Sequence, residues 1–440
     1  MNFSQLKLPL TRLKQNSLAK NTLWMLLAQG LRLVLQAGYF VIIARVLGPE
    51  QYGAFVGVTA LISILAPFAS LGGGNLLIKN VSRNKALFAE YWGNALWMIV
   101  GSGLGLFALV LLIAPAILPK TIPLLLIVLV CLTDLIFARV LDVAGQAFQA
   151  VLWLSKTAQL NILPQVTRII AALALASLFD HPQALEWTFL YLISTAVSAL
   201  IAVFLVHRLL GYPKLALWRI KSEIAEGFYF SIGLSAQTVY NDIDKTMLAR
   251  LASLSATGIY ASAYRLIDVA FVPVRSLLAA AYTKFFQHGT SGITGTMGFA
   301  KRLLPLAALY GVGVGIALFC LAPVVPYILG SEYQDAIAAL RWLAPLPLLK
   351  ALHYFAADTL TGAGFQGIRS AMQAIVAIFN VSLNLWLIPA YSWQGAAWAS
   401  LASDGFLVLG LWIAVAFIYR QQLQTSEEKA WLFPPQTRNL

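Results

Sequence analysis

The chain has 440 residues, 60% of them hydrophobic and only 11% charged, and its formal net charge is +13. Soluble globular domains carry about 25% charged residues, so this composition excludes an ordinary soluble protein. Apolar runs of about 20 residues recur along the chain, and each can cross the hydrocarbon core of a bilayer as a helix. The alternating pattern of a membrane β-barrel is absent, so we predict an all-α polytopic membrane protein.

The first 21 residues are polar and basic, with four lysines and arginines and no acidic residue. They lack the separate apolar core of a cleavable signal peptide. We therefore expect a cytoplasmic N-terminus over residues 1–21, with the first membrane segment acting as its own insertion signal.

Twelve membrane-spanning helices are predicted, separated by turn residues such as Gly48-Pro49. Their spans are 22–44, 53–78, 92–114, 122–148, 158–179, 187–206, 225–249, 257–281, 302–327, 336–360, 368–389 and 395–419. The longest interior connection divides the chain near its midpoint. We expect six helices in each of two lobes, with these bounds: N-lobe 22–206, cytoplasmic linker 207–224, C-lobe 225–419 and cytoplasmic tail 420–440.

The stretch Ala44–Ile62 has a counterpart 205 residues later, at Ala249–Ile267. The two copies share five identical residues, among them Gly53 and Gly258, and each lies between two long apolar segments. Parallel internal repeats of this kind build two-lobed transporters whose substrate site lies between the lobes near the middle of the membrane. The repeat therefore predicts two pseudo-symmetric lobes around a central cavity.

Loop charges predict the orientation of the chain in the membrane. Connections on the side of the N-terminus contain nineteen lysines and arginines, whereas the opposite side contains three, which are Arg45, Lys120 and Arg250. Because basic loops stay in the cytoplasm, this asymmetry places both termini there. The positive net charge is thus mainly an orientation signal, and the scattered bases do not indicate nucleic-acid binding.

Fifteen charged residues fall inside the predicted spans, away from the first two residues of each span. The bases are Arg32, Arg139, Arg168, Lys245, Arg265, Arg275, Arg341 and Lys350. The acids are Asp134, Asp142, Asp242, Asp244, Asp268, Asp358 and Asp404. Each such group costs about 2.5–3.5 kcal/mol at the centre of a membrane helix, so these side chains should face the interior of the bundle or a water-filled cavity.

Spacing predicts ion pairs for some of these residues. Three pairs are three residues apart and so share a helix face: Arg139 with Asp142, Asp242 with Lys245, and Arg265 with Asp268. Arg275 lies seven residues after Asp268, so the eighth span carries a polar stripe. Arg32 and Arg168 have no acidic partner in their own spans and are better candidates for an anionic ligand, because guanidinium groups match phosphate oxygens. A purely structural role for each ion pair stays open.

We predict a cationic substrate-binding cavity lined by Arg32, Arg139, Arg168, Lys245, Arg265 and Arg275. Such a cavity would attract a large anion, and a pyrophosphate-linked lipid is one such substrate. The candidates for coupling to an ion gradient are Asp142, Asp242, Asp268 and Asp358.

Signatures of enzymes and cofactors were not found. The chain lacks the phosphate-binding motif Gly-x-x-x-x-Gly-Lys-Ser/Thr and the nucleophile motif Gly-x-Ser-x-Gly, so ATP hydrolysis is not expected and coupling to H⁺ or Na⁺ is the default. The acidic stretch Asn241–Asp244 lacks the third acid of a magnesium-diphosphate site. Cys131 and Cys320 lie in apolar segments, where packing is their expected role. We expect no enzymatic activity, no metal and no cofactor.

Three stretches carry a family resemblance. Ala44–Phe55 reads ARVLGPEQYGAF, Ile243–Leu266 joins the seventh predicted span to the eighth, and Asn380–Ala397 joins the eleventh to the twelfth. Together they resemble the polysaccharide-transport family of the multidrug/oligosaccharidyl-lipid/polysaccharide exporter superfamily, and the likeness covers about residues 20–420.

The resemblance implies twelve helices in two lobes with a central cavity open to one side at a time. It implies flipping of undecaprenyl-pyrophosphate-linked oligosaccharides across the bacterial cytoplasmic (inner) membrane, during the synthesis of O-antigen, capsule or exopolysaccharide. Polymerase and chain-length regulator proteins would be partners, and some members couple to H⁺ or Na⁺. The related lipid II flippases use arginines in their first and eighth spans, where Arg32, Arg265 and Arg275 lie here, but those flippases have two further C-terminal helices.

Three other functions stay open. A multidrug or small-cation antiporter of the same superfamily would have a cavity dominated by acids, whereas eight bases accompany seven acids here. A membrane polysaccharide polymerase or ligase would need a large outside loop with catalytic residues, and the outside connections here are short. A scaffold subunit of an export complex is the third alternative.

Overall fold

The computed structural model describes residues 9–432, with side chains from residue 30 to residue 424 except for part of 217–237. All secondary structure in this part of the chain is helical, and no β-strand occurs in it. Seven helical segments there are long and apolar enough to cross a membrane, or up to eight if a bent pair counts as one. The prediction of an all-α, multi-pass membrane protein is therefore confirmed, and the number of twelve crossings stays a prediction. The outer ends of the predicted N-terminus 1–21 and tail 420–440 lie outside the described residues.

Two of these segments, Gly30–Arg83 and Gln366–Gln424, contain 54 and 59 residues, whereas one crossing needs about 20. Both are interrupted. Helix α1 (Pro9–Leu65) breaks at Gly48, where φ is 69°, and α15 (Gln366–Leu432) breaks at Ser392, where φ is 52°. Glycine adopts such a φ without steric cost, and the proline after Gly48 cannot continue the helical hydrogen bonds of the preceding turn. Both breaks fall in gaps that the sequence predicts between spans.

The chain forms two compact units, Met1–Ser235 and Ala236–Leu440, and α8 (Leu217–Leu251) contributes to both. The predicted division into lobes 22–206 and 225–419 around a linker at 207–224 stays a prediction.

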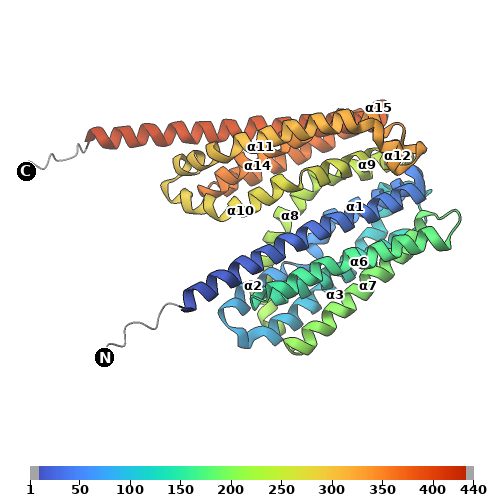
Figure 1. Cartoon of the computed structure of the whole chain (residues 1–440), viewed down its shortest axis with the longest axis horizontal. Helices are drawn as coiled ribbons and strands as arrows, with labels where there is room; N and C mark the ends of the chain where they lie inside the picture. Colours follow the sequence, from blue (N-terminus) through green and yellow to red (C-terminus); the bar gives the residue numbers. More distant parts are fainter. Residues whose placement is uncertain (1–8, 433–440) are drawn as a thin grey trace, which may run out of the picture. The chain divides into compact units, whose positions relative to one another are not determined.

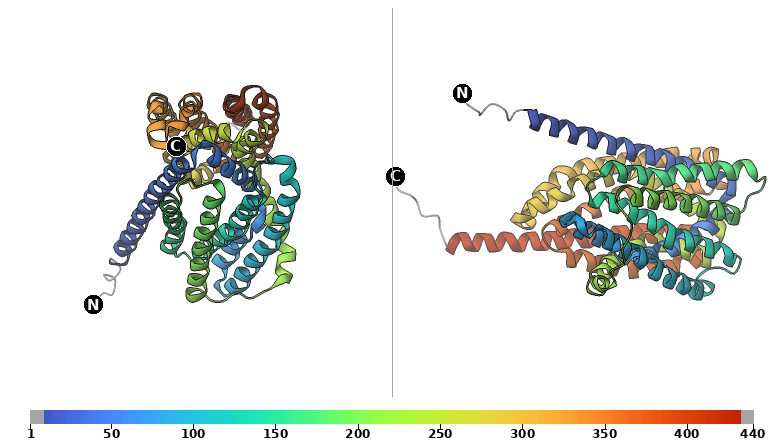
Figure 2. Two further views of the ribbon diagram at one scale, coloured as in Figure 1. Left: turned by 90° about the vertical axis from the view of Figure 1, so that its right-hand side faces the viewer. Right: turned by 90° about the horizontal axis from the view of Figure 1, so that it is seen from below.

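The first unit is a bundle in which α1 packs against α6 and α6 against α7 (Figure 1). After α1 it contains η1 (Ala66–Ser70), α2 (Gly73–Arg83), η2 (Lys85–Leu87), α3 (Phe88–Ile117), α4 (Leu124–Cys131), a π-helical turn η3 (Leu132–Phe137), α5 (Ala138–Ala150), α6 (Leu154–Leu178) and α7 (Ala184–Leu209). Figure 2 shows these helices running side by side. Large side chains such as Trp92 and Phe148 are fully buried in its core.

The backbone of the segment after α7 is fixed onto α3 by hydrogen bonds. The backbone N–H of Lys214 donates to the carbonyl of Ala89 at 2.8 Å. The side chain of Asn94 accepts from the N–H of Ala216 at 2.9 Å and donates to its carbonyl at 3.1 Å. A side chain at Gly93 would place its Cβ only 2.3 Å from the carbonyl oxygen of Lys214, so this close approach requires glycine.

In the second unit α11 packs against α14, and α14 packs against α15 (Figure 1). After α8 the unit contains α9 (Leu254–Ala270), α10 (Val272–His288), η4 (Gly289–Ser291), α11 (Ile293–Leu321), η5 (Ala322–Val324), α12 (Val325–Leu329), η6 (Ser331–Tyr333), α13 (Ala336–Leu343), α14 (Leu346–Gly362) and α15. Phe271, Phe285 and Phe355 are fully buried in its core.

The predicted eighth span, 257–281, is bent. Helices α9 and α10 meet at 48° around Phe271. Pro273, in the first turn of α10, lacks an N–H and its ring crowds the carbonyl four residues earlier, which explains the break. The predicted polar stripe along this span is therefore not on one straight helix, because Asp268 belongs to α9 and Arg275 to α10.

Candidate functional site

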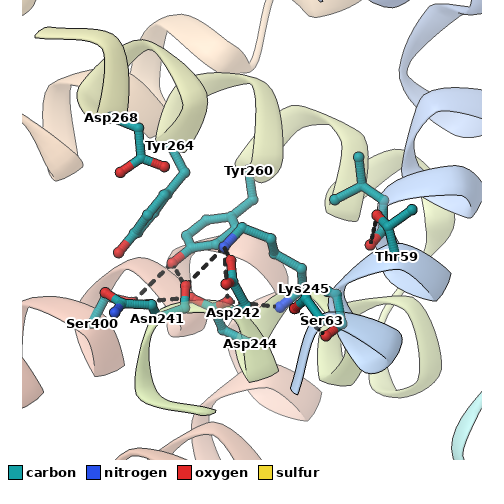
Figure 3. Close-up of polar contacts among 12 residues, drawn as sticks. Thr59, Ser63, Asn241, Asp242, Asp244, Lys245, Tyr260, Tyr264, Asp268 and Ser400 are labelled. Atoms are coloured by element: carbon teal, nitrogen blue, oxygen red, sulfur yellow. Dashed lines mark hydrogen bonds and ion pairs between the residues drawn. The ribbon is translucent and has the colours of Figure 1, made fainter. Parts of the chain in front are cut away.

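A cluster of charged and hydroxyl side chains lies inside the second unit, where α8 and α9 meet (Figure 3). Helix geometry places Asn241, Asp242 and Lys245 on neighbouring turns of α8. The ammonium of Lys245 lies 2.7 Å from Oδ1 of Asp242 and donates to the carbonyl of Asn241 at 2.8 Å. Only 9% of the Lys245 side chain is exposed, against 36% for Asp242. The spacing-based prediction of an ion pair between these residues is matched by the geometry.

Asp244 connects three helices of the cluster. Its carboxylate accepts hydrogen bonds from the hydroxyl of Tyr260 on α9 and, at 3.2 Å, from that of Ser400 on α15. Its other oxygen accepts the backbone N–H of Lys245 at 2.8 Å and lies 3.6 Å from the ammonium of the same residue. Only 1% of this side chain is exposed. A buried carboxylate with this many donors is well compensated for the loss of water.

Lys350 brings a second ammonium into the cluster from α14. It donates to the amide oxygen of Asn241 at 3.1 Å and to the hydroxyl of Tyr264 at 2.8 Å. The ammonium groups of Lys245 and Lys350 lie 4.3 Å and 4.9 Å from the centre of the Tyr264 ring, within the range of cation–π attraction. The two lysines balance Asp242 and Asp244 in formal charge. The sequence places Lys350 at membrane depth but not in the predicted site.

A second polar group lies in the first unit, around Arg168 of α6. Its guanidinium lies 4.8 Å from the ring centre of Tyr191 and donates to the Tyr191 hydroxyl at 3.4 Å. That hydroxyl donates in turn to Asp134 at 2.8 Å. Asp134 lies in the π-helical turn between α4 and α5, and such turns are frequent at functional sites. Arg168 lacks an acidic partner on its own helix, as predicted, but Tyr191 links it to an acid on another.

Arg139 and Asp142 form the ion pair that their spacing predicts, at 3.1 Å. Both side chains line a small cavity of about 130 Å³ together with Asn75, Gln146 and Ser231. The pair therefore borders space for water or a small ion.

Three predicted bases remain, and one of them borders the cluster of the second unit, because Asp268 lies beside Tyr264 (Figure 3). Arg275 lies 3.6 Å from Asp268 across the bend between α9 and α10. Arg265 is on α9. Arg32 is on α1, half-buried, and no ion pair is recorded for it among the described side chains.

Asp358 is paired with Arg369 at 3.3 Å, and Arg369 also donates to the hydroxyl of Thr361 at 2.9 Å. A further buried pair, which the sequence did not single out, consists of His353 and Asp404, whose Nε2 and Oδ1 atoms are 3.0 Å apart. Each of the four predicted ion-coupling carboxylates thus has a basic partner: Arg139 for Asp142, Lys245 for Asp242, Arg275 for Asp268 and Arg369 for Asp358.

Comparison with known sequences gives one family. The family described as "Polysaccharide biosynthesis protein" matches residues 18–283, which is more than half of the chain. No curated protein sequence matches the chain at a significant level.

Several solved structures share the fold. An inward-facing multidrug resistance MATE family transporter of the MOP superfamily is 14% identical, with a TM-score of 0.72 over 88% of this chain and 96% of that one. The lipid II flippase MurJ, in its inward closed conformation, is 12% identical, with a TM-score of 0.72 over 89% and 87% of the two chains. A MOP superfamily transporter from Pyrococcus furiosus is 13% identical, with a TM-score of 0.62 over 90% and 95%. At these identities the likeness establishes the fold.

Proposed function

The chain belongs to the polysaccharide biosynthesis protein family, and from this premise we propose that it is a flippase for lipid-linked oligosaccharides. It moves undecaprenyl-pyrophosphate-linked units from the inner to the outer leaflet of the bacterial inner membrane by alternating access. Its fold, shared with a lipid II flippase, supports this proposal. Both termini are cytoplasmic in this proposal, and polymerase and chain-length regulator proteins use the product.

The observation that carries the proposal is the buried ammonium of Lys350. Only 3% of this residue is exposed, and among the described residues its hydrogen-bond partners are neutral, an amide and a phenol. A charge at membrane depth is costly and is retained mainly where it has a function. A pyrophosphate supplies the negative charge that these neutral partners do not.

Coupling to H⁺ or Na⁺ fits the pairing of the acids. Asp242 is the more exposed carboxylate of the cluster, and it holds Lys245 by an ion pair. Protonation of Asp242, or binding of Na⁺ to it, removes the charge that Lys245 faces. Lys245 is then available to an anionic substrate, while the buried Asp244 keeps the helices together. The same exchange applies to Asp142, Asp268 and Asp358 and their basic partners. The predicted arginines Arg32, Arg139, Arg168, Arg265 and Arg275 remain further candidates for contact with the substrate.

Lys350→Met tests the proposal, because methionine keeps much of the side-chain volume and removes the charge. The assay uses vesicles that contain the purified protein and a fluorescent pyrophosphate-linked oligosaccharide. We expect this variant to flip the lipid at least about tenfold more slowly, because the loss of one charge-assisted hydrogen bond corresponds to about that factor. Lys284→Met is the control, since Lys284 is exposed on α10. Flipping at the wild-type rate by Lys350→Met would remove this lysine from the site.

Cation antiport is a second candidate, because the fold matches a MATE family transporter and a lipid II flippase with the same TM-score, 0.72. The cluster contains as many carboxylates as ammonium groups and so has no excess of negative charge. In the same vesicles, uptake of a small organic cation without movement of the glycolipid would support the antiporter and contradict the flippase.

A further inference from the structure

The second unit contains a large groove that the proposed transport does not use. It has a volume of about 940 Å³ and lies between α11, α13 and the start of α14, within the range of pockets that hold small ligands. Gly311 and Gly315 line the groove, and they let α11 pack closely against the junction between α13 and α14. A Cβ on Gly315 would lie 2.7 Å from the carbonyl oxygen of Ala344. The groove is therefore built into the helix packing.

The apolar walls of the groove are open. Ile316, Phe319 and Trp342 line it and are 61%, 51% and 47% exposed. Ile316 and Phe319 belong to a helical segment, Ile293–Leu329, that is long and apolar enough to cross a membrane. Exposed apolar side chains on such a segment face hydrocarbon chains. This part of the groove therefore suits an acyl chain.

The groove also has polar lining residues. Gln334 and Asp335 lie just before α13, and Arg341 lies in its last turn. The guanidinium of Arg341 lies 5.3 Å from the ring centre of Phe319. Although Arg341 and Asp335 line the same groove, no ion pair is recorded for either of them among the described residues. A ligand with one negative and one positive group can satisfy both.

We propose that this groove binds a glycerophospholipid of the phosphatidylethanolamine class. Its acyl chain lies along Ile316 and Phe319, its phosphate accepts hydrogen bonds from Arg341, and its primary ammonium donates to Asp335. Guanidinium groups bind phosphate through two parallel hydrogen bonds. Phosphatidylglycerol offers Asp335 only neutral hydroxyl groups, and phosphatidylcholine carries an ammonium without N–H groups, so neither gives Asp335 a charged hydrogen-bond donor.

Native mass spectrometry of the full-length purified protein, with lipids of identical acyl chains added singly, tests the proposal. We expect phosphatidylethanolamine to bind about tenfold more tightly than phosphatidylcholine or phosphatidylglycerol, since one charge-assisted hydrogen bond corresponds to about that factor. Arg341→Ala should weaken the binding of all three lipids. Asp335→Asn should abolish only the preference for phosphatidylethanolamine.

A pair of tryptophan substitutions tests the location. Ala338 lines the groove and is exposed, so Ala338→Trp should fill it and lower lipid retention. Leu309 is 71% exposed on the same α11 but does not line the groove, so Leu309→Trp should retain lipid as the wild type does. Equal retention by both variants, or wild-type protein that binds phosphatidylglycerol as well as phosphatidylethanolamine, would overturn the proposal. Thermal unfolding of each variant checks that it is folded.

Discussion

Two aspartates of α8, only two residues apart, have different surroundings. Asp244 is almost fully buried and accepts hydrogen bonds from Tyr260, Ser400 and the backbone. Asp242 is 36% exposed and pairs with Lys245. Residues two apart on a helix point in nearly opposite directions, which is why one carboxylate enters the core and the other stays accessible. The first therefore holds helices together, and the second is free to exchange partners.

Asparagine at each of these positions separates the two roles. Asp244→Asn weakens charge-assisted hydrogen bonds in the core and should lower the stability by about 2 kcal/mol. Asp242→Asn removes a partly exposed ion pair and should cost less than about 1 kcal/mol. Thermal unfolding in detergent measures both, and the ion dependence of flipping should change in Asp242→Asn. An equal loss of stability in the two variants would contradict this division.

Residue spacing predicted contacts between charged residues only where both partners lie on the same helix. The pairs Arg139–Asp142 and Asp242–Lys245 are present because residues three apart lie on one face. The contact of Lys350 with Asn241 joins residues 109 apart in the sequence. No helical periodicity encodes such a contact, because it depends on how helices pack.

At the scale of elements, glycine and proline were the most informative residues. Gly48-Pro49 predicts a break that α1 shows, since φ is positive there. The π-helical turn at Leu132–Phe137 has no such marker. It contains no glycine or proline, and its apolar residues continue the pattern of the flanking helices. In a π-helical turn each hydrogen bond spans one residue more than in an α-helix, and this shift leaves no signal in the composition.

The docking of the segment after α7 onto α3 gives a matched pair of substitutions within one helix. Gly93→Ala places a Cβ 2.3 Å from the carbonyl oxygen of Lys214, so we expect the unfolding free energy to fall by about 1–3 kcal/mol. Gly101→Ala, also in α3, meets nothing within 4 Å and should be neutral or stabilising by up to about 1 kcal/mol. Thermal unfolding of the purified variants measures both effects. A Gly93→Ala protein as stable as Gly101→Ala would show that the segment does not pack tightly on α3.

At the scale of the whole molecule, composition predicted the helical membrane class, and the family motifs agreed with the family match over residues 18–283. The number of crossings is harder to predict. Hydropathy shows how long an apolar stretch is, but it does not show where a helix is interrupted. Helix α15, for example, is interrupted at Ser392. The orientation in the membrane depends on loop charges and not on packing, so it requires a separate measurement.

Cysteine labelling in intact cells measures that orientation. Cys320 is exposed and is first replaced by serine, whereas Cys131 is buried and can stay. Lys214 and Lys120 are both exposed, so a cysteine at either position is accessible to a reagent on its side of the membrane. Because basic loops stay in the cytoplasm, Lys214→Cys should react with a membrane-impermeant maleimide only after the cells are permeabilised.

Lys120→Cys is the matched variant and should react from outside without permeabilisation. It lies in the short connection between α3 and α4, on the side with few bases. Labelling of Lys214→Cys in intact cells, with protection of Lys120→Cys, would invert the topology and place both termini outside. Transport from the inner to the outer leaflet would then run along the helices in the direction opposite to the proposed one. The same reactivity at both positions would mean that an even number of spans separates them instead of the predicted odd number, and the arrangement of twelve crossings would have to be revised.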